Sequence, residues 1–351
     1  MPITVRALSV PSAGAPFGVA AIKRRDPGPA DVLIDISYAG VCHSDVHFAR
    51  NDWGFSTYPM VPGHEITGVV SAIGAEVTRH AVGDRVAVGN LLGSCRTCDN
   101  CRSGLEQYCE RGGAGAAAAA GHDGTVASGG YSQKIVVDQD FVLRVPQALD
   151  DMAAAAPLLC AGITMYSALR YWHAGPGTRV AIAGMGGLGH LGVKMAAAMG
   201  AEVSVLSRTL ANEKDGLRFG AAHYYAMSGE DMPGRLAGRF DLIISTVSAA
   251  SDMTPLLSML GTSGTLVMAG APVQPLSAPV GLLISGRRNL AGTSVGGIAE
   301  TQEMLDFCAA HRISAETEII RADQIEHAFA RLDAADVRYR LVIDAATLSE
   351  L

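Results

Sequence analysis

The sequence predicts an α/β protein of two domains, with a doubly wound parallel sheet inserted between two pieces of a β-rich domain. Short β-branched runs separated by Gly, Pro and Asp fill the chain up to about residue 150. After that point strand-like runs alternate with helical ones, which is typical of a parallel α/β sheet. The length of 351 residues is enough for two domains of roughly 150 residues each.

The expected elements follow from these patterns. The β-rich domain is predicted to hold residues 1–152 and 294–351, with strands at 32–36, 67–70 and 85–88. Residues 112–121 contain only Gly and Ala, which predicts a mobile surface loop. The α/β domain is predicted at 153–293, with strands at 180–183, 203–207, 223–226, 242–245, 266–269 and 290–293 and a helix at 188–199.

Composition and charge exclude several classes of partner. Lys and Arg total 27 against 34 for Asp and Glu, a net charge of −7 without a basic stripe, so we expect no nucleic-acid partner. An apolar fraction of 49% excludes a chain that is disordered throughout. The N-terminus shows no signal-peptide pattern, and no uncharged apolar run reaches the roughly 20 residues of a membrane span. We therefore expect a cytoplasmic protein without a membrane partner.

Four cysteines form the most specific local motif, Cys95-x2-Cys98-x2-Cys101-x7-Cys109. Two-residue gaps let thiolates turn toward one centre, and four Cys ligands leave no open coordination position. The alternatives are an iron–sulfur cluster, whose known short spacings differ, and disulfides, which a reducing compartment disfavours. The motif predicts a structural zinc site.

Cys42, His64 and Cys160 are the other residues that suggest a metal. Two thiolates and one imidazole would leave a fourth coordination position for water or substrate, and a zinc held in this way acts as a Lewis acid. The spacing alone is weak evidence, because a single Cys160 after an Ala-rich segment is more often a small buried residue.

A glycine motif predicts dinucleotide binding. The segment from Gly184 through Gly186 to Gly189 matches G-x-G-x-x-G, with Gly187 and Leu188 completing the turn between a strand and a helix. Such a turn places a pyrophosphate on the helix N-terminus. The alternative is an ordinary glycine-rich turn.

The residues after the next strand bear on the choice of cofactor. An acidic residue expected there for NAD is absent, and the chain has Ser207 and Arg208, with Lys214 close by. A hydroxyl and a guanidinium suit a 2′-phosphate, which predicts NADP over NAD. The alternative is that Arg208 is a solvated residue after a strand.

Several segments together resemble a known family. The segments GVCHSDVH at 40–47, WGFSTYP at 53–59 and VPGHE at 61–65 resemble the zinc-dependent medium-chain alcohol dehydrogenases, and within them the cinnamyl alcohol dehydrogenase branch. The segments GLEQYC at 104–109, GGYS at 129–132 and GIAETQEMLDFC at 297–308 are similar to the same branch. The Gly/Ala-rich stretch after Cys109 departs from it. The resemblance implies a GroES-like β-rich catalytic domain and a Rossmann domain, with the active site in the cleft between them.

The resemblance also implies roles for the metal-binding residues. Cys42, His64 and Cys160 would hold a catalytic zinc, so that each chain would bind two zinc ions. Glu65 would be a nearby or exchangeable fourth ligand. Asp45 would orient His64 through its second ring nitrogen.

The same resemblance implies a proton relay and cofactor contacts. Ser44 would hydrogen-bond the substrate oxygen, and the relay would pass through the cofactor ribose to His47, supported by Asp52. His43 would approach the cofactor diphosphate, and Thr164 would approach the nicotinamide.

The implied activity is the interconversion of primary alcohols and aldehydes with NADP(H), with an aromatic or allylic substrate such as cinnamyl alcohol or a broad range. Trp53 and Ile298 are candidates for the substrate pocket, although Trp53 could instead pack the cleft wall. Alternatives are an NAD-linked alcohol or polyol dehydrogenase of the same superfamily and a catalytically silent zinc- and cofactor-binding sensor. We expect a homodimer by analogy of fold. Cys308 is interpreted as buried helix packing and His190 as helix surface.

Overall fold

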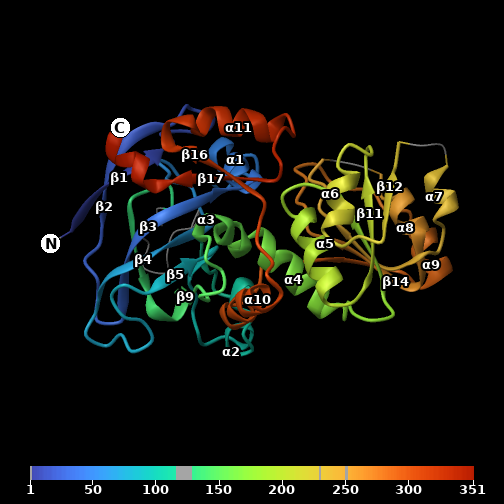
Figure 1. Cartoon of the computed structure of the whole chain (residues 1–351), viewed down its shortest axis with the longest axis horizontal. Coiled ribbons are helices and arrows are strands. Elements are labelled where there is room, and N and C mark those ends of the chain that lie inside the picture. Colours follow the sequence, from blue (N-terminus) through green and yellow to red (C-terminus); the bar gives the residue numbers. More distant parts are fainter. Residues whose placement is uncertain (1, 116–128, 229–230, 250–251) are drawn as a thin grey trace. The chain divides into compact units, whose positions relative to one another are not determined.

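The computed structural model describes residues 2–115, 129–228, 231–249 and 252–351. They form two compact units, Met1–Ile163 with Gly296–Leu351 and Thr164–Val295 (Figure 1). The sequence had placed the first boundary at residues 152 and 153. The difference arises because α3 (Met152–Ala155) and the 3₁₀ helix η3 (Ala156–Leu159) pack on strands of the first unit. There the Thr67 hydroxyl donates a hydrogen bond of 2.8 Å to the Met152 carbonyl oxygen.

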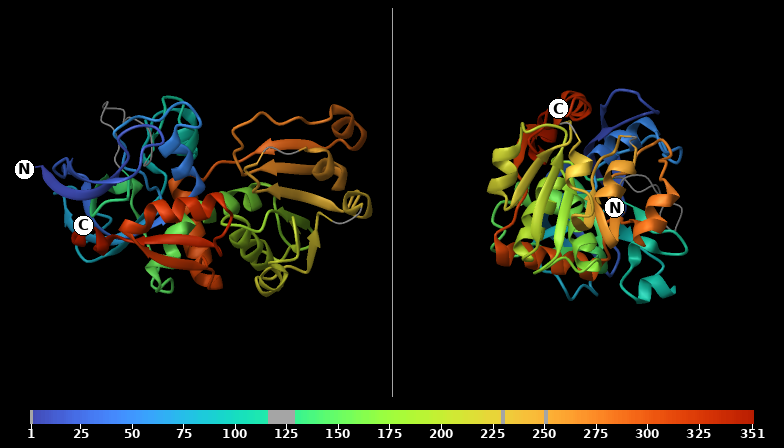
Figure 2. Two further views of the ribbon diagram at one scale, coloured as in Figure 1. Left: turned by 90° about the horizontal axis from the view of Figure 1, so that it is seen from above. Right: turned by 90° about the vertical axis from the view of Figure 1, so that its right-hand side faces the viewer.

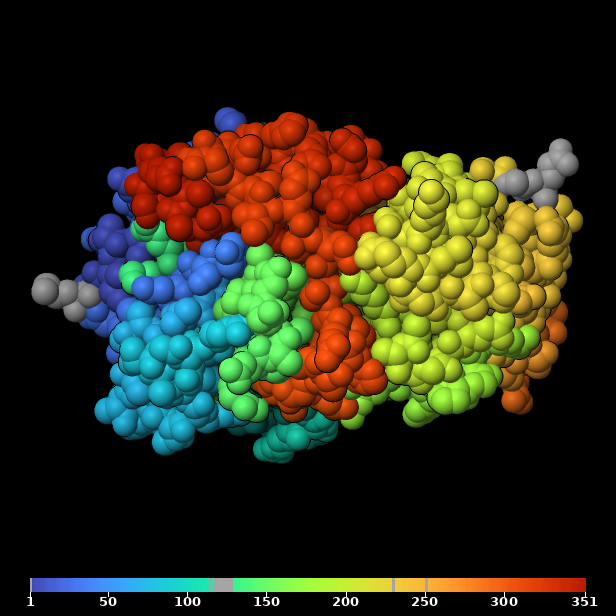
Figure 3. All heavy atoms as spheres, viewed as in Figure 1, coloured from blue at the N-terminus to red at the C-terminus, as the bar shows by residue number. Residues whose placement is uncertain are grey.

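The first unit is built around a seven-stranded sheet of order β16-β17-β3-β4-β5-β9, with β8 also paired to β3. Its strands are β3 (Asp31–Val41), β4 (Ile66–Ile73), β5 (Arg85–Val88), β8 (Lys134–Asp138), β9 (Leu143–Arg144), β16 (Thr317–Arg321) and β17 (Arg340–Asp344). The strands expected at 32–36, 67–70 and 85–88 are confirmed within β3, β4 and β5. Because β17 pairs with β3, the C-terminal segment is part of the same sheet, and its red surface lies beside blue N-terminal residues in Figure 3.

Alternation along β3 explains how one strand supports two cores. Val32, Ile34 and Ile36 belong to one buried apolar cluster, whereas Ala39 and Val41 belong to another. Successive side chains of a strand point to opposite faces, and the irregularities in pairing with β4 redirect the second half. Strand β3 ends at Val41, and Cys42, the first of the expected metal ligands, is the next residue.

Further strands and helices complete the first unit. They are β1 (Ile3–Ser9), β2 (Gly18–Arg24), α1 (His43–Arg50), β6 (Leu91–Gly93), α2 (Asp99–Arg102), β7 (Ala114–Gly115), α10 (Ile298–His311) and α11 (Ile325–Asp333). Part of the expected Gly/Ala loop is a strand, since Ala114 and Gly115 form β7, which pairs antiparallel with β6. Residues 116–121 of that loop lie outside the described residues.

The second unit is a six-stranded sheet in which every neighbouring pair is parallel. Its strands are β10 (Arg179–Ala183), β11 (Glu202–Ser207), β12 (His223–Ala226), β13 (Phe240–Ser245), β14 (Leu260–Met268) and β15 (Asn289–Gly292). The order β12-β11-β10-β13-β14-β15 is that of a doubly wound dinucleotide-binding sheet (Figure 2). All six predicted strands are confirmed, and β14 begins earlier than expected.

The helices of this unit connect the strands. They are α5 (Gly189–Ala198), α6 (Glu213–Arg218), α7 (Met232–Arg235), α8 (Thr254–Met259) and α9 (Val280–Gly286), while α4 (Ala161–Tyr171) crosses the boundary between the units. The helix predicted at 188–199 is α5. Within the described ranges no single helix is long and apolar enough to cross a membrane, and one bent pair, Met152–Leu159 with Ala161–Tyr171, meets the length and composition criteria.

Candidate functional site

Four side chains from three separate segments meet inside the first unit. Cys42 lies between β3 and α1, His64 and Glu65 directly precede β4, and Cys160 lies between η3 and α4. All four are buried, and their potential ligand atoms lie within 4.8 Å of one another. The tertiary structure thus unites Cys42, His64, Glu65 and Cys160 in one cluster.

The geometry of this cluster fits a zinc ion. Tetrahedral zinc with Zn–S bonds of about 2.3 Å separates two sulfur ligands by about 3.8 Å. The Cys42 and Cys160 sulfurs are 3.9 Å apart, far longer than a disulfide bond of about 2.05 Å. The pKa of Cys42 lies well below its usual range, because Cys160 forms a hydrogen bond with it and because His64 and Arg340 are close by. Burial acts in the opposite direction but is outweighed. Low pKa favours the thiolate, which is the form that binds metal.

Asp45 positions two residues of this cluster through hydrogen bonds. Its carboxylate, fully buried, accepts hydrogen bonds from the Cys42 N–H at 2.9 Å and the Gly63 N–H at 3.0 Å. The Asp45 Oδ1 atom is also 3.0 Å from His64 Nδ1. Although burial opposes it, this carboxylate raises the pKa of His64. Because Nδ1 faces Asp45, the other ring nitrogen of His64 is the one available to a metal.

Two further residues complete the surroundings, and neither was predicted from the sequence. The Tyr131 hydroxyl donates a hydrogen bond of 3.0 Å to Asp45 Oδ2. The Arg340 guanidinium, on β17, forms a buried ion pair with Glu65. Tyr131 lies in the segment GGYS and is 0% exposed; a buried Tyr normally needs a partner for its hydroxyl, a signal that sequence reasoning had not used. No sequence pattern identifies Arg340.

The relay residues lie on and directly after α1. Ser44 Oγ is 3.7 Å from Cys42 Sγ, so the hydroxyl borders the cluster. His47 Nδ1 is 2.7 Å from Asp52 Oδ2, and the other ring nitrogen of His47 is buried without a hydrogen-bond partner among the described residues. His43 is exposed and its ring lies 5.9 Å from that of His47.

The two candidates for the substrate pocket have different surroundings. The Trp53 ring lies 4.9 Å from the His47 ring. Ile298 begins α10, and its N–H donates to Glu106 Oε2 at 3.1 Å. Its side chain packs against the core cluster that contains Phe141. The contacts described for Ile298 do not include the residues of the buried cluster.

The cysteine quartet forms a second cluster. The sulfurs of Cys95, Cys98, Cys101 and Cys109 lie within 4.8 Å of one another, and those of Cys95 and Cys101 are 3.8 Å apart. Backbone N–H groups of Thr97 and Cys98 lower the pKa of Cys95 to about 5. Four sulfurs at tetrahedral spacing fit a closed zinc site, which stabilises a fold and leaves no position for substrate.

The glycine motif forms the turn between β10 and α5. Gly184 has a φ of +99°, and a Cβ at Gly189 would lie 1.9 Å from the Gly184 carbonyl oxygen, so both positions require glycine. Around Gly186 a Cβ would meet nothing within 4 Å, which leaves room for a ligand to approach. Leu188 precedes α5 without a side-chain cap, and the His190 N–H donates to the Gly186 carbonyl oxygen at 3.1 Å. The helix end still offers its partial positive charge to an anion.

One interpretation of this turn is wrong. His190 was expected on the helix surface, but it is 0% exposed. Its Nδ1 lies 3.2 Å from the Gly186 carbonyl oxygen, so the ring packs beneath the turn. By contrast, Cys308 is buried on α10 as expected, with its sulfur 3.6 Å from Met304 Sδ.

The remaining cofactor candidates lie in the second unit. Ser207 ends β11, Arg208 is the next residue and is exposed, and Lys214 is exposed on α6. Within the part of the chain that the structure describes, neither Arg208 nor Lys214 forms an ion pair. Thr164 is buried on α4.

Comparison with known proteins agrees with these features. Residues 28–147 match the family model described as alcohol dehydrogenase GroES-like domain, and residues 187–310 match that described as zinc-binding dehydrogenase. The NADP-dependent alcohol dehydrogenase C of Mycobacterium tuberculosis is 54% identical over 345 residues, 98% of this chain and 99% of the relative.

Solved structures extend the likeness. A cinnamyl alcohol dehydrogenase from Sorghum bicolor superposes with a TM-score of 0.95 at 40% identity, over 98% of each chain. A cinnamyl alcohol dehydrogenase from Helicobacter pylori complexed with NADP(H) superposes with a TM-score of 0.93 at 38% identity, over 99% of each chain. This chain therefore belongs to the zinc-dependent medium-chain alcohol dehydrogenases, in their cinnamyl alcohol dehydrogenase-like branch.

Proposed function

We propose that this protein interconverts primary alcohols and aldehydes by hydride transfer with NADP(H), at the cluster of Cys42, His64 and Cys160. The observation that carries the proposal is the convergence of two thiols and one imidazole in a buried cluster whose sulfurs are 3.9 Å apart. Three protein ligands would leave the fourth position that substrate needs, and Glu65, which the structure pairs with Arg340, would be an exchangeable occupant of it.

The residues of the cluster divide the chemistry among them. Zinc held there supplies a Lewis acid that polarises a carbonyl oxygen, and NADPH supplies the hydride for the carbonyl carbon. Asp45 fixes the ring of His64, and therefore the nitrogen that faces the metal. Ser44 borders the cluster and donates a proton to the substrate oxygen in reduction, or takes it in oxidation.

His47 replaces the proton that Ser44 gives up. Its Nδ1 is held by Asp52 at 2.7 Å. The buried Nε2 of His47 has no hydrogen-bond partner among the described residues, so it is the atom that would take up or release the relayed proton; a bound cofactor would supply the ribose hydroxyl between His47 and Ser44. His43 is proposed to contact the cofactor diphosphate, and Thr164 the nicotinamide.

The cofactor is proposed to be NADP(H) because Ser207, Arg208 and Lys214 offer a hydroxyl and two cations to a 2′-phosphate. Replacement of Arg208 by Gln is expected to raise the KM for NADPH about tenfold or more and to change that for NADH less than about twofold. Arg235→Gln, an exposed arginine of the same unit, is the matched control. Equal effects of Arg208→Gln on both cofactors would contradict the assignment.

The substrate is proposed to be an aromatic or allylic alcohol or aldehyde. The Trp53 ring adjoins His47 and is itself flanked by two aromatic rings, with ring centres 5.0 Å away for Phe48 and 6.0 Å away for Phe55, on which it stacks. These rings present an apolar surface beside the proposed relay, and aromatic side chains favour a flat, conjugated substrate. The relatives from Sorghum and Helicobacter, both cinnamyl alcohol dehydrogenases, support the same class.

The test is the initial rate of NADPH and NADH oxidation with cinnamaldehyde at matched cofactor concentrations, with the zinc content measured on the same sample. Fast turnover that prefers NADPH is expected. Activity with NADH alone would contradict the cofactor assignment and retain the reaction. Two bound zinc ions without turnover of any aldehyde would favour the silent sensor instead.

A homodimer is proposed from the edge of the second sheet. Among the described strands, β15 ends the sheet order with β14 as its one neighbour. Leu290 on β15 is 44% exposed, and Val280 and Ile284 on the preceding helix α9 are 63% and 77% exposed. An open strand edge beside apolar side chains pairs readily with a second copy. Ile284→Asp is expected to convert the dimer to a monomer in analytical ultracentrifugation; a wild type that sediments as a monomer would contradict the proposal.

The cytoplasm is proposed as the compartment. All seven cysteines are free thiols in the structure. Thiols close enough to bind metal stay reduced in a reducing compartment.

A further inference from the structure

A buried histidine beneath the glycine turn takes no part in the chemistry proposed above. His190 is 0% exposed although it is the second residue of α5. Its backbone N–H and its Nδ1 atom both bond to the Gly186 carbonyl oxygen, at 3.1 and 3.2 Å. Because a carbonyl oxygen only accepts hydrogen bonds, Nδ1 is the nitrogen that donates. His190 therefore occupies both lone pairs of this one carbonyl.

The planarity of the peptide bond converts this contact into an orientation. In a trans peptide the C=O and the following N–H point in opposite directions. A Gly186 carbonyl held by the buried His190 ring therefore directs the Gly187 N–H away from that ring. This N–H has no backbone acceptor among the residues that the structure describes. Gly186 is exposed, and a Cβ there would meet nothing within 4 Å, so a ligand has room to approach the peptide.

The first glycine of the motif is held in a similar way. The Thr246 hydroxyl lies 3.0 Å from the Ala183 carbonyl oxygen and 3.2 Å from that of Gly184. Carbonyl oxygens carry partial negative charge and repel an anion. With the carbonyl groups of Gly184 and Gly186 bonded inside the unit, the turn leaves N–H groups for a diphosphate.

Aromatic packing restricts the His190 ring. Phe219, the residue after α6, is 7% exposed, and its ring centre lies 6.0 Å from that of His190. Lys194 Nζ and Arg218 Cζ lie 4.6 and 4.4 Å from the centre of the same Phe219 ring. A fully buried imidazole in close packing has little room to rotate, so Nδ1 stays on the Gly186 carbonyl.

The geometry points to His190 as a positioning residue for the cofactor: its Nδ1–H holds the Gly186 carbonyl inward, so that the Gly187 N–H is oriented toward the diphosphate of NADPH before the cofactor binds. This inference rests on the proposed cofactor site at the glycine turn. His190 acts through the peptide between Gly186 and Gly187 and does not itself touch the cofactor. Loss of its bond removes preorganisation and weakens cofactor binding, while the zinc chemistry stays the same.

The test compares His190→Leu with His190→Asn in the zinc-loaded protein. Asn and Leu are nearly equal in size and shape, and the Asn amide places an N–H close to the position of Nδ1. We expect His190→Leu to weaken the affinity for NADPH about threefold to tenfold, the equivalent of one hydrogen bond, and His190→Asn to stay within about twofold of the wild type. Because Leu favours a helix more than Asn does, a more stable α5 cannot explain that order.

Two ligands separate the turn from the rest of the cofactor site. Fluorescence titration measures the dissociation constant of NADPH, which contains the diphosphate. Isothermal titration measures that of adenosine 2′-monophosphate, which carries the 2′-phosphate alone. His190→Leu should weaken the binding of NADPH only. The KM for NADPH should rise with it, whereas kcat and the KM for cinnamaldehyde should not change. A purely structural role would instead lower Tm and weaken both ligands alike.

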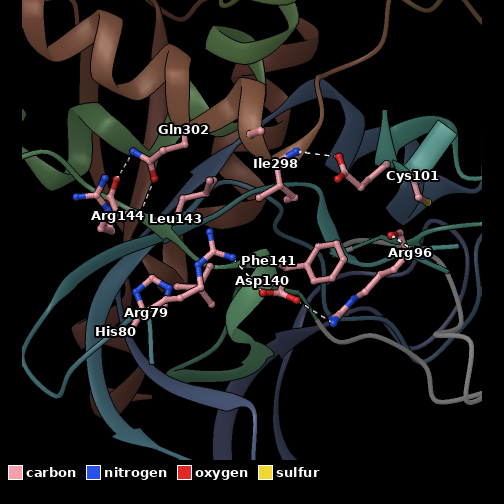
Figure 4. A pocket seen from close by; sticks show the side chains of 14 residues that line it. Arg79, His80, Arg96, Cys101, Asp140, Phe141, Leu143, Arg144, Ile298 and Gln302 are labelled. Carbon is pink, nitrogen blue, oxygen red and sulfur yellow. Dashed lines mark hydrogen bonds and ion pairs between the residues drawn. The ribbon is translucent and has the colours of Figure 1, made fainter. Parts of the chain in front are cut away.

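Two further variants serve as controls. In Gly186→Ala the methyl group has room in the free turn but crowds the diphosphate, so NADPH should bind more weakly. His80→Leu removes a buried imidazole, 7% exposed, from the first unit, where His80 lies at the wall of a pocket (Figure 4). It should lower Tm and leave the affinity for NADPH unchanged.

The outcomes distinguish the cofactor site from the role of His190. Unchanged NADPH affinity in Gly186→Ala would overturn the site at the turn, and the inference with it. Weaker binding in Gly186→Ala with unchanged binding in His190→Leu would overturn the role of His190 alone. Equal weakening by His190→Leu and His190→Asn, or an equal loss of adenosine 2′-monophosphate binding, would overturn it as well. If His190→Leu does not fold, His190→Gln replaces it, because its amide lies farther from the backbone than Nδ1.

Discussion

Removal of one oxygen atom from Tyr131 tests how much the environment of His64 contributes to metal binding. In Tyr131→Phe the ring stays and the hydrogen bond of 3.0 Å to Asp45 Oδ2 is lost. Tyr131 and Asp45 are both 0% exposed, so water does not replace the missing donor. Burial, together with the nearby carboxylate, raises the pKa of Tyr131, so the hydroxyl remains a donor in the wild type.

The structure sets the size of the effect. A hydrogen bond to a charged group contributes about 1.5–3 kcal/mol. Asp45 Oδ2 keeps one donor, the Cys42 N–H at 2.9 Å. Burying a Phe side chain also costs less free energy than burying a Tyr side chain, so the lower end of that range applies. Because about 1.4 kcal/mol is a factor of ten, we expect zinc at the Cys42–His64–Cys160 cluster to bind roughly tenfold more weakly.

The assay is chelator competition with zinc counted per chain. Tyr131→Phe is expected to lose one of its two zinc ions at about tenfold lower chelator concentration, with a lower kcat and an unchanged KM for NADPH. Tyr58→Phe is the matched control, since its hydroxyl donates to the backbone carbonyls of Phe48 and Ala49 at 2.9 and 3.0 Å. That variant should lose about 0.5–1.5 kcal/mol of stability without earlier zinc release. Equal zinc retention in both variants would refute the role of Tyr131 as a positioning residue.

Three further predictions concern the metal clusters and pH. Cys160→Ala should abolish turnover and remove one zinc per chain while the circular dichroism spectrum stays the same; residual activity above a few per cent would contradict it. Cys98→Ala should lower Tm and promote aggregation, because it removes a ligand from the closed site, whose metal stabilises the fold. A normal Tm would argue against a structural zinc. Arg179 hydrogen-bonds Asp241 at 2.6 Å and lowers the pKa of that carboxyl. Since both side chains are over 40% exposed, Asp241→Asn should cost at most about 1 kcal/mol at pH 7. A carboxyl whose pKa is lowered by folding stabilises the fold at pH values above its unfolded pKa, and that contribution is lost as the pH falls through its folded pKa. The difference in free energy of unfolding between the wild type and Asp241→Asn should therefore vanish below about pH 4. A difference that grows there would contradict this.

Local patterns predict the elements of the second unit well. Its strands are short runs separated by helical segments, the central ones mostly buried and apolar, and each run is recognisable without knowledge of its neighbours. The glycine turn is predicted for the same reason, because φ of +99° at Gly184 and the close approach at Gly189 are requirements of a few adjacent residues. The error at His190 shows the limit of such reasoning: periodicity does not reveal that the ring packs beneath the turn.

The two metal clusters differ in how far the sequence alone identifies them. The cysteine quartet spans fifteen residues, so spacing by itself brings the sulfurs together. Cys42 and Cys160 are 118 positions apart, yet their sulfurs lie 3.9 Å from each other. For that pair the residue pattern was ambiguous, and only the resemblance to a family joined them.

Contacts between distant segments depended on the tertiary structure. Arg340 meets Glu65 across 275 positions, because β17 from the C-terminal segment pairs with β3. Tyr131 meets Asp45 across 86 positions, and its backbone N–H donates to the Pro62 carbonyl oxygen, which lies next to Gly63 and His64. A local pattern specifies the backbone over a few residues, whereas these partners are set by the order in which strands pair. The motifs and the family resemblance they carry therefore predicted the reaction, and the pairing of the strands determined which side chains surround it.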